Sequence, residues 1–260
     1  MIFYKMEGLG NDYIYLPDTA DMAPEQVRKM SDRHFGIGGD GVVLISSSGK
    51  ADFAMRIFNA DGSEAEMCGN AIRCVGKLAA DLGFQKKTVA IETKAGIKTV
   101  FLLPDGRVKV DMGEPEIRSI GQEITLPSHH KITLAVLSMG NPHAVVFVPQ
   151  ITDAMVCGQG PEIENHPLFA HKTNVEFVRI LDRNNIQMRV WERGAGETLA
   201  CGTGACAAVV AAAAHHLTER AATVHLRGGD LAIDWDEKTN HIFKTGPANI
   251  VFKGEYAWSK

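Results

Sequence analysis

The sequence lacks a hydrophobic run long enough to cross a membrane. Its longest uninterrupted apolar stretch is Ala205 to Ala214, ten residues, whereas a membrane-spanning helix needs about 20. The first residues, Met1 to Glu7, also lack the apolar core of a secretory signal. We therefore expect a cytoplasmic protein with no membrane partner.

The sequence also has no large excess of positive or negative charge, and it has few cysteines. The 260 residues carry 27 Lys and Arg against 31 Asp and Glu, a net charge of −4. Proteins that bind the nucleic-acid backbone need a basic face, so we expect no nucleic-acid partner. The five cysteines of a cytoplasmic protein are expected to be thiols and not disulfides.

Short β-branched runs, broken by Gly, Pro and Asp, dominate the chain and predict many strands, several with the alternation of half-buried antiparallel sheet. Helices are predicted at about 24–34, 70–82 and 203–217. The last is apolar on every side, so we expect strands to enclose it. The predicted class is α+β, with long buried helices each wrapped by mostly antiparallel strands. The strands are predicted at 41–45, 53–58, 88–91, 107–111, 144–148, 174–179, 185–191, 223–226 and 231–235.

An internal repeat indicates how the chain is organised. Met55-Arg-Ile-Phe58 lies 133 positions before Met188-Arg-Val-Trp191, and an ordered series of matches at one offset indicates duplication. We infer two pseudo-symmetric domains, 1–118 and 119–260, and we leave open a return of the last strand to the first domain. The same offset joins Glu64 to Glu197, Cys68 to Cys201 and Gly69 to Gly202.

Cys68 and Cys201 each stand on a turn that opens a predicted helix. A helix N-terminus lowers the pKa of a thiol, and its free N–H groups bind anions. Two such thiols facing one cleft suit the inversion of a stereocentre. One thiolate would remove the proton next to a carboxylate, and the opposite thiol would deliver a proton to the other face.

The other cysteines have simpler interpretations. Cys74 and Cys206 lie inside predicted helices and are expected to be buried apolar side chains. We expect a structural role for Cys157 too. The spacings of 6 and 5 between neighbouring cysteines do not match the close pairs of structural zinc sites. A non-catalytic thiol or zinc-binding protein nevertheless stays open as an alternative.

The segment Gly36 to Gly41 fits the dinucleotide pattern G-x-G-x-x-G. That fingerprint needs a strand before it and a helix after it, whereas here the predicted helix precedes and the strand follows. We expect a loop that shapes the cleft.

A set of ordered motifs shows a family resemblance. The motifs are Gly8-Leu-Gly-Asn-Asp12, Asp32-Arg-His-Phe-Gly-Ile-Gly38, Phe58-Asn-Ala-Asp-Gly-Ser63, Cys68-Gly-Asn-Ala71, Gly140-Asn-Pro-His143, Thr173-Asn-Val-Glu-Phe177, Glu192-Arg-Gly194 and Ala200-Cys-Gly-Thr-Gly204. Over essentially its whole length the chain resembles the diaminopimelate epimerases. The resemblance implies two pseudo-symmetric domains with the active site between them, a homodimer, and interconversion of LL- and meso-diaminopimelate without pyridoxal phosphate or metal. A racemase of another amino acid, of the histidine or proline type, is the nearest alternative.

The resemblance also implies roles for individual residues. Cys68 and Cys201 would be the two acid/base thiols, with His143 and Glu192 beside them, and Glu192 would also contact the substrate. Gly69, Asn70, Gly202 and Thr203 would hold the reacting carboxylate. Asn11, Asn59, Asn141, Asn174 and Arg193 would recognise the substrate, Arg193 through its planar fork of donors. Glu7, Gly41 and Phe252 stand where the family commonly has His, Gln and Tyr.

Overall fold

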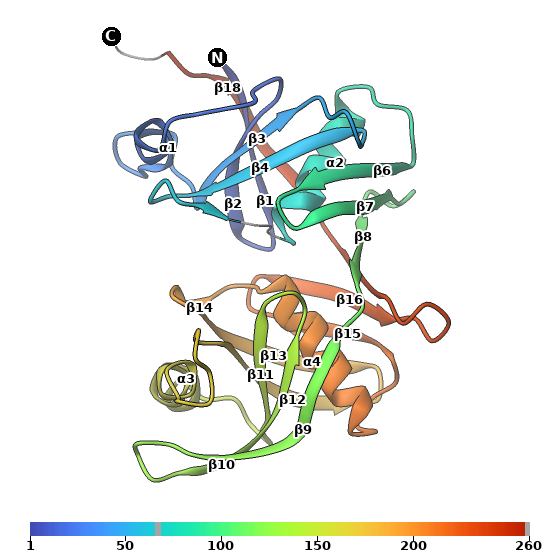
Figure 1. Ribbon diagram of the computed structural model, residues 1–260. Helices are drawn as coiled ribbons and strands as arrows, with labels where there is room; N and C mark the ends of the chain where they lie inside the picture. Colours follow the sequence, from blue (N-terminus) through green and yellow to red (C-terminus); the bar gives the residue numbers. More distant parts are fainter. Residues whose placement is uncertain (66–68, 258–260) are drawn as a thin grey trace. The chain divides into compact units, whose positions relative to one another are not determined.

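The computed structural model describes residues 1–65 and 69–257. It divides into two compact units, Met1–Asp111 together with the chain from Thr245 onward, and Met112–Lys244 (Figure 1). The sequence placed this division after residue 118. The structure places it earlier because β9 (Glu116–Thr125) already pairs with β10 (Lys131–Ser138) of the second unit. The last strand, β18 (Asn249–Glu255), pairs with β1 (Ile2–Gly8) of the first unit.

The first unit is a mixed sheet with two helices. Strand β1 pairs antiparallel with β18 and β2, and β2 then pairs parallel with β3. Strand β4 pairs antiparallel with β3 and β5 and parallel with β6, which forms a hairpin with β7. The further bounds are β2 (Asn11–Leu16), β3 (Gly41–Ser46), β4 (Phe53–Asn59), β5 (Glu64–Ala65), β6 (Thr88–Thr93), β7 (Gly96–Leu102), α1 (Pro24–Ser31) and α2 (Ala71–Asp81).

Helix α2 is held closely against the sheet of the first unit. It contacts β1, β2, β7 and β18, and it buries Ile72, Val75 and Leu78 completely. Gly76 allows this approach, because a Cβ atom there would lie 2.6 Å from a methyl group of Val100. Helix α1 begins at Pro24, a residue suited to the first helical turn, and packs on β3.

The second unit repeats the pairings of the first at the offset found in the sequence. Val42 pairs with Phe58, and 133 residues later Val175 pairs with Trp191. The offset also holds between β4–β6 and β13–β15, where Phe53–Ile91 corresponds to Ile186–Val224. The bounds are β11 (Pro142–Phe147), β12 (Asn174–Asp182), β13 (Asn185–Glu192), β14 (Gly196–Thr198), β15 (Ala221–Leu226) and β16 (Gly229–Trp235). The chain passes between the units along β8 (Val108–Gly113) and β17 (Ile242–Gly246).

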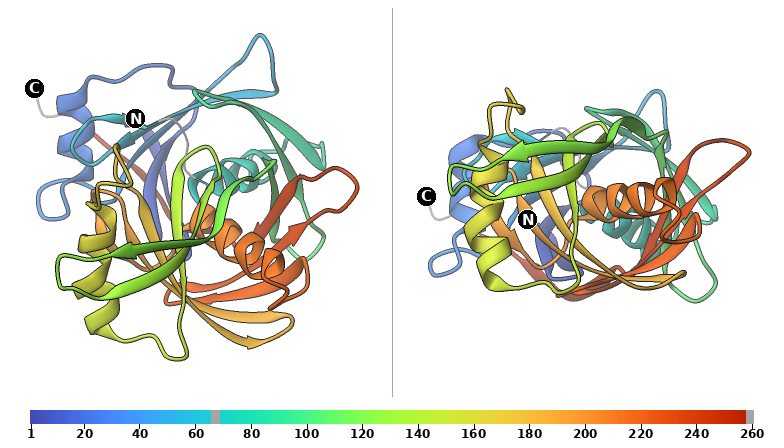
Figure 2. Two further views of the ribbon diagram at one scale, coloured as in Figure 1. Left: turned by 60° about the horizontal axis from the view of Figure 1, so that its bottom comes forward. Right: turned by 90° about the horizontal axis from the view of Figure 1, so that it is seen from below.

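Helix α4 (Gly202–Ala214) forms the centre of the second unit. Every residue from 205 to 212 is completely buried, and strands β9 to β13, β15 and β16 contact the helix. Figure 2 shows these strands curving around it (orange). Helix α4 is therefore buried among strands of its own unit. In the part of the chain that the structure describes, no helix combines the length and apolar character that a bilayer span requires.

One helical segment of the second unit has no counterpart in the sequence-based prediction. A π-helix, η1 (Ala154–Gln159), runs directly into the short helix α3 (Gly160–Glu164). The sequence does not predict this helical segment, because it contains Gly158, Gly160 and Pro161, which usually mark turns. The segment buries Val156 and Ile163 in the core, and a Cβ at Gly160 would lie 2.8 Å from Cβ of Trp191.

Candidate active site

Cys201 caps the N-terminus of helix α4. Its backbone is extended, with φ of −117° and ψ of 113°, and its Sγ accepts a hydrogen bond from the Gly204 N–H at 3.4 Å. The hydroxyl of Thr203 lies 3.5 Å from the same sulfur. The residue is only 5% exposed. The turn after β14 therefore fixes the thiol at a helix end, where a thiolate would be stabilised.

A fully buried carboxyl group, a half-buried one and an imidazole lie near this helix end. Glu192, at the end of β13, accepts a hydrogen bond from the Thr198 hydroxyl, and its negative charge acts on the Cys201 thiol. Burial raises the pKa of Glu192. Glu176 of β12 has its Oε1 at 2.7 Å from Nδ1 of His143 on β11, and both side chains are fully buried. The site thus has several groups that exchange protons close to one sulfur.

The surroundings of Cys201 favour the neutral thiol over the thiolate. Burial raises its pKa well above the ordinary value, and the negative charges of Glu192 and Glu176 raise it further. Hydrogen bonds from Thr203 and Gly204 act in the opposite direction but are the smaller effects. The expectation of a lowered thiol pKa is therefore wrong here, because desolvation exceeds the stabilisation at the helix end.

Two asparagines that the sequence assigned to the site, both in the second unit, hold neighbouring groups in place. Asn141 connects the imidazole with the helix end, since its Oδ1 lies 3.1 Å from His143 Nε2 and its Nδ2 donates to Thr203 Oγ1 at 3.3 Å. Asn174, 4% exposed, donates to the Pro142 carbonyl and accepts from the Arg193 N–H, both at 2.9 Å. The Arg193 side chain extends to the exposed surface.

The structure thus gathers all the predicted site residues of the second unit into one connected group. Its members are Asn141, His143, Asn174, Glu192, Arg193, Cys201, Gly202 and Thr203, and Gly202 is the first residue of α4.

In the first unit, Cys68 lies outside the described residues. Its neighbours Gly69 and Asn70 are buried just before α2. The guanidinium of Arg73 binds both of them, with Nη1 at 3.4 Å from the Gly69 carbonyl and 3.0 Å from Asn70 Oδ1. Arg73 is itself fully buried and donates through Nε to the Pro247 carbonyl at 3.0 Å. This arginine anchors the start of α2 to the chain before β18.

Asn11 and Asn59 both lie beside Asp40 in the first unit. Asn11 Nδ2 donates to Asp40 Oδ2 at 2.6 Å. The N–H of Ala60, next to Asn59, donates to the Asp40 carbonyl at 3.0 Å. The Asn59 side chain is exposed and bonds the Ser63 hydroxyl at 3.0 Å. Asp40 therefore connects the two loops that carry these asparagines.

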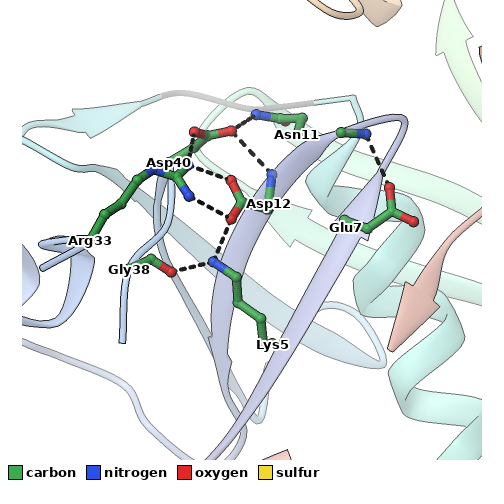
Figure 3. A network of polar contacts seen from close by, with 8 residues as sticks. Lys5, Glu7, Asn11, Asp12, Arg33, Gly38 and Asp40 are labelled. Carbon is green, nitrogen blue, oxygen red and sulfur yellow. Dashed lines mark hydrogen bonds and ion pairs between the residues drawn. The ribbon is translucent and has the colours of Figure 1, made fainter. Parts of the chain in front are cut away.

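A network of charges supports the loop of Asn11 (Figure 3). Arg33 holds both carboxylate oxygens of Asp12, at 3.1 and 2.7 Å, and also Asp40 Oδ1 at 2.9 Å. Lys5 lies 2.6 Å from Asp12 Oδ2. Burial alone would raise the pKa of Asp12, but Arg33 and Lys5 together lower it below its usual value. The loop is thus tied to β1 and to the segment after α1.

The three departures from the family pattern have identifiable surroundings. Glu7 accepts hydrogen bonds from Asn249 at 2.6 Å and from the Gly10 N–H at 3.0 Å, so it closes the turn before Asn11. Gly41 has no room for a side chain, because a Cβ there would lie 1.9 Å from the Phe58 carbonyl oxygen. Phe252 packs edge to face on Phe3, with ring centroids 5.8 Å apart.

Comparison with known proteins decides the family. The family model described as diaminopimelate epimerase matches residues 3–118 and 135–251. A diaminopimelate epimerase of Acetivibrio thermocellus is 52% identical over 276 aligned residues that cover 98% of both chains. One of Methanococcus maripaludis is 51% identical over 275, covering 98% of this chain and 99% of that protein. The chain belongs to the diaminopimelate epimerase family. It is accordingly an isomerase.

Solved structures of more distant proteins have the same fold as this family member. A phenazine biosynthesis protein of the PhzF family from Bacillus anthracis superposes with a TM-score of 0.73 at 17% identity, covering 99% of each chain. A probable proline racemase from Agrobacterium radiobacter gives a TM-score of 0.73 at 16% identity, covering 99% of this chain and 93% of the other. At these identities the likeness shows the fold alone, a strand-rich α+β architecture with few helices.

Sequence reasoning assigned no role to three groups of this site, Glu176, Asp40 and the buried Arg73. Glu176 had a signal, since it is a lone acidic residue inside the apolar strand segment Val175 to Val178. A charged side chain in a buried strand is rare unless it has a partner. The partner, His143, is 33 residues away in sequence, and only the parallel pairing of β11 with β12 brings the two together.

Proposed function

We propose that this protein interconverts LL- and meso-2,6-diaminopimelate in lysine and peptidoglycan biosynthesis, without pyridoxal phosphate or a metal. Its membership of the diaminopimelate epimerase family supports the substrate. The observation that carries the chemistry is the Cys201 thiol, held at the N-terminus of the buried helix α4 by the hydrogen bond from the Gly204 N–H. A protonated thiol at a helix end can deliver a proton beside a carboxylate.

The proposed reaction moves one proton away from the α-carbon and another onto it. The thiolate of Cys68 takes the α-proton as the C–H bond breaks, and Cys201 gives its own proton to the opposite face as the new C–H bond forms. Cys68 is then a thiol and Cys201 a thiolate, so the reverse reaction uses the same two groups in exchanged roles. The raised pKa of Cys201 supports its role as the acid of the free protein.

The reacting carboxylate would lie at the starts of helices α2 and α4. Gly202 and Thr203 open α4, and Gly69 and Asn70 immediately precede α2. The N–H groups of a first helical turn have no partner within the helix and carry partial positive charge. They stabilise the negative charge that the carbanion places on the carboxylate oxygens.

We assign the remaining site residues to the rest of the substrate. Asn11, Asn59, Asn141 and Asn174 offer amide donors and acceptors without net charge, which suits a zwitterionic head group. Arg193 offers a planar guanidinium that can bind a carboxylate through two hydrogen bonds. The exposed position of its side chain and the bond from its N–H to Asn174 support this assignment. His143 and Glu192 would adjust the protonation of the cysteines.

The wider organisation is part of the same proposal. Two pseudo-symmetric domains, each with a central helix wrapped by strands, would carry one acid/base cysteine each. The matched strand registers at an offset of 133 residues support this duplication. We further propose a cytoplasmic homodimer that binds a small amino-acid substrate.

A panel of single-enantiomer amino acids tests the proposal. We expect LL-diaminopimelate to be converted to the meso form, and proline and histidine to keep their configuration. Inversion of proline or histidine in place of diaminopimelate would contradict the assigned substrate. Cys68→Ala and Cys201→Ala should each abolish the reaction with the fold intact. Cys157→Ala, at the exposed thiol of η1, is the matched control and should leave the rate unchanged.

A further inference from the structure

A continuous chain of hydrogen bonds leads from Glu176 to the sulfur of Cys201. Glu176 Oε1 lies 2.7 Å from His143 Nδ1, and His143 Nε2 lies 3.1 Å from Asn141 Oδ1. Asn141 Nδ2 donates to Thr203 Oγ1 at 3.3 Å, and Thr203 Oγ1 lies 3.5 Å from Cys201 Sγ. All five residues belong to the second unit, so every step of the chain lies within one compact body.

The chain has a defined direction. Asn141 Oδ1 can only accept, so Nε2 of His143 must carry a hydrogen, whether the second proton of the buried pair is on Nδ1 or on Glu176. Asn141 then donates to Thr203 through its amide nitrogen. This bond uses one acceptor site of the Thr203 hydroxyl and leaves the hydroxyl hydrogen free to be donated to the sulfur of Cys201 when that sulfur is a thiolate. A donor at that sulfur favours the thiolate.

Glu176 is held firmly at the start of this chain. It is completely buried, and a Cβ at Gly204 would lie only 2.6 Å from its Oε1. Among the described residues, Oε2 of Glu176 has no hydrogen-bond partner, so the bond to His143 is the one polar contact that fixes this carboxyl group. His143 is likewise completely buried.

Among the described residues, the carboxylates of Glu176 on β12 and Glu192 on β13 act on the Cys201 thiol through their charge, and His143 of β11 bonds to Glu176. If Glu176 acted on the thiol only through its negative charge, its removal would make the thiolate easier to form. If it acts through the chain, its removal frees His143 and Asn141 to turn, and the thiolate loses its donor. The two possibilities predict opposite changes in the pKa of the Cys201 thiol when Glu176 is replaced.

We infer that Glu176 is a positioning residue for Cys201, acting through His143, Asn141 and Thr203 to keep a hydroxyl donor on the sulfur. The inference rests on the proposed function of Cys201 as an acid/base thiol. It assigns a purpose to a buried carboxyl group that does not itself touch the reacting atoms. It also explains how a deeply buried thiol can become a thiolate in the reverse reaction.

The test measures the pKa of the Cys201 thiol in the full-length protein without substrate. Alkylation by iodoacetamide is followed by mass spectrometry of the Cys201 peptide over a pH series. A change in access scales the rate at every pH, whereas a change in pKa moves the midpoint. Glu176→Met, which cannot bond to His143, should raise the midpoint by about one to two pH units, the equivalent of one hydrogen bond to a charged group. A midpoint that is unchanged or lower would overturn the inference.

Conservative variants separate positioning from loss of structure. Glu176→Gln can still bond to His143 and should recover most of the change seen in Glu176→Met. Thr203→Val should raise the midpoint in the same way, and Thr203→Ser should restore it. In the double variant Glu176→Met with Thr203→Val, the midpoint should rise no further than in Thr203→Val alone. Both substitutions interrupt the same chain of hydrogen bonds, so the second has nothing left to remove. Additive effects would contradict the chain. If Glu176→Met does not fold, the two Thr203 variants still decide the outcome.

The second unit contains a similar hydrogen-bonded histidine that serves as a matched control. His225 lies between Asp230 Oδ1, at 2.8 Å, and Asn185 Oδ1, at 3.1 Å, the same arrangement away from the thiol. Asp230→Ala should leave the Cys201 midpoint unchanged, and a shift as large as that of Glu176→Met would refute the inference. Failure to epimerise diaminopimelate would count against the proposed function alone, since the alkylation midpoint needs no substrate.

Discussion

Gly204 is the position where the candidate site is most sensitive to one added methyl group. It lies in the first turn of α4, directly against the buried carboxyl group of Glu176. In Gly204→Ala the new Cβ would lie 2.6 Å from Glu176 Oε1 and 3.2 Å from its Cδ. Glu176 would have to move away from His143, its hydrogen-bond partner at 2.7 Å.

The cost of this substitution can be worked out from its parts. Alanine gains about 1 kcal/mol over glycine in a helix. Overpacking a core costs about 1–3 kcal/mol, and losing a hydrogen bond that involves a charged group costs about 1.5–3 kcal/mol. We therefore expect Gly204→Ala to lower the free energy of unfolding by about 2–5 kcal/mol and to slow epimerisation.

Urea unfolding measures the effect, and Gly158→Ala is the matched control. Gly158 lies in the helical segment η1 of the same unit, and a Cβ there would meet nothing within 4 Å. This control should leave stability unchanged or raise it by up to about 1 kcal/mol. A Gly204→Ala protein as stable as the control would refute the close seating of Glu176 at the helix end.

Three further substitutions have defined outcomes. Glu192→Gln should raise the free energy of unfolding at pH 8 while slowing epimerisation, because the raised pKa of Glu192 makes its ionisation more costly in the folded state than in the unfolded chain. Asp12→Asn should lower stability at pH 7, and the difference from the unaltered protein should shrink as the pH falls below about 4: the lowered pKa of Asp12 stabilises the fold above the unfolded-state pKa, and this is lost as the pH falls through the folded pKa. Urea titrations at the stated pH values check both. Arg193→Lys should raise KM for diaminopimelate more than it lowers kcat, because lysine cannot bind a carboxylate with two parallel hydrogen bonds, and steady-state kinetics measure the split.

Much of the fold could be predicted from the internal repeat and from the pattern of apolar residues in the sequence. The repeat at 133 residues becomes a repeat of strand registers, as Val42–Phe58 and Val175–Trp191 show. The all-apolar stretch from Ala205 could only be stable inside a unit, and the structure encloses it. The sequence did not predict the helical segment from Ala154 to Glu164, because its glycines and proline are typical of turns. In the structure the segment is helical and packs on Trp191.

The sequence pointed to residues that the structure brings together in the second unit, but it did not predict the energetics of these groups. The turn before α4 pointed to Cys201, yet the direction of its pKa shift depends on burial and on Glu192 and Glu176. Burial is a property of the assembled unit and not of the local motif. Glu176 was recognisable only as a lone charge in an apolar strand, because its partner His143 belongs to another strand.

The central claim is that two separate thiols exchange protons with one carbon, and isotope exchange at early times tests it most directly. LL-diaminopimelate is incubated with the enzyme in D₂O, and the first meso product and the remaining substrate are analysed by mass spectrometry. Two thiols predict one deuterium at the inverted carbon of the product and none in the remaining substrate, because the acid exchanges with solvent while the base returns the original proton. A product that keeps its original hydrogen would show one group carrying the proton across and would contradict the account.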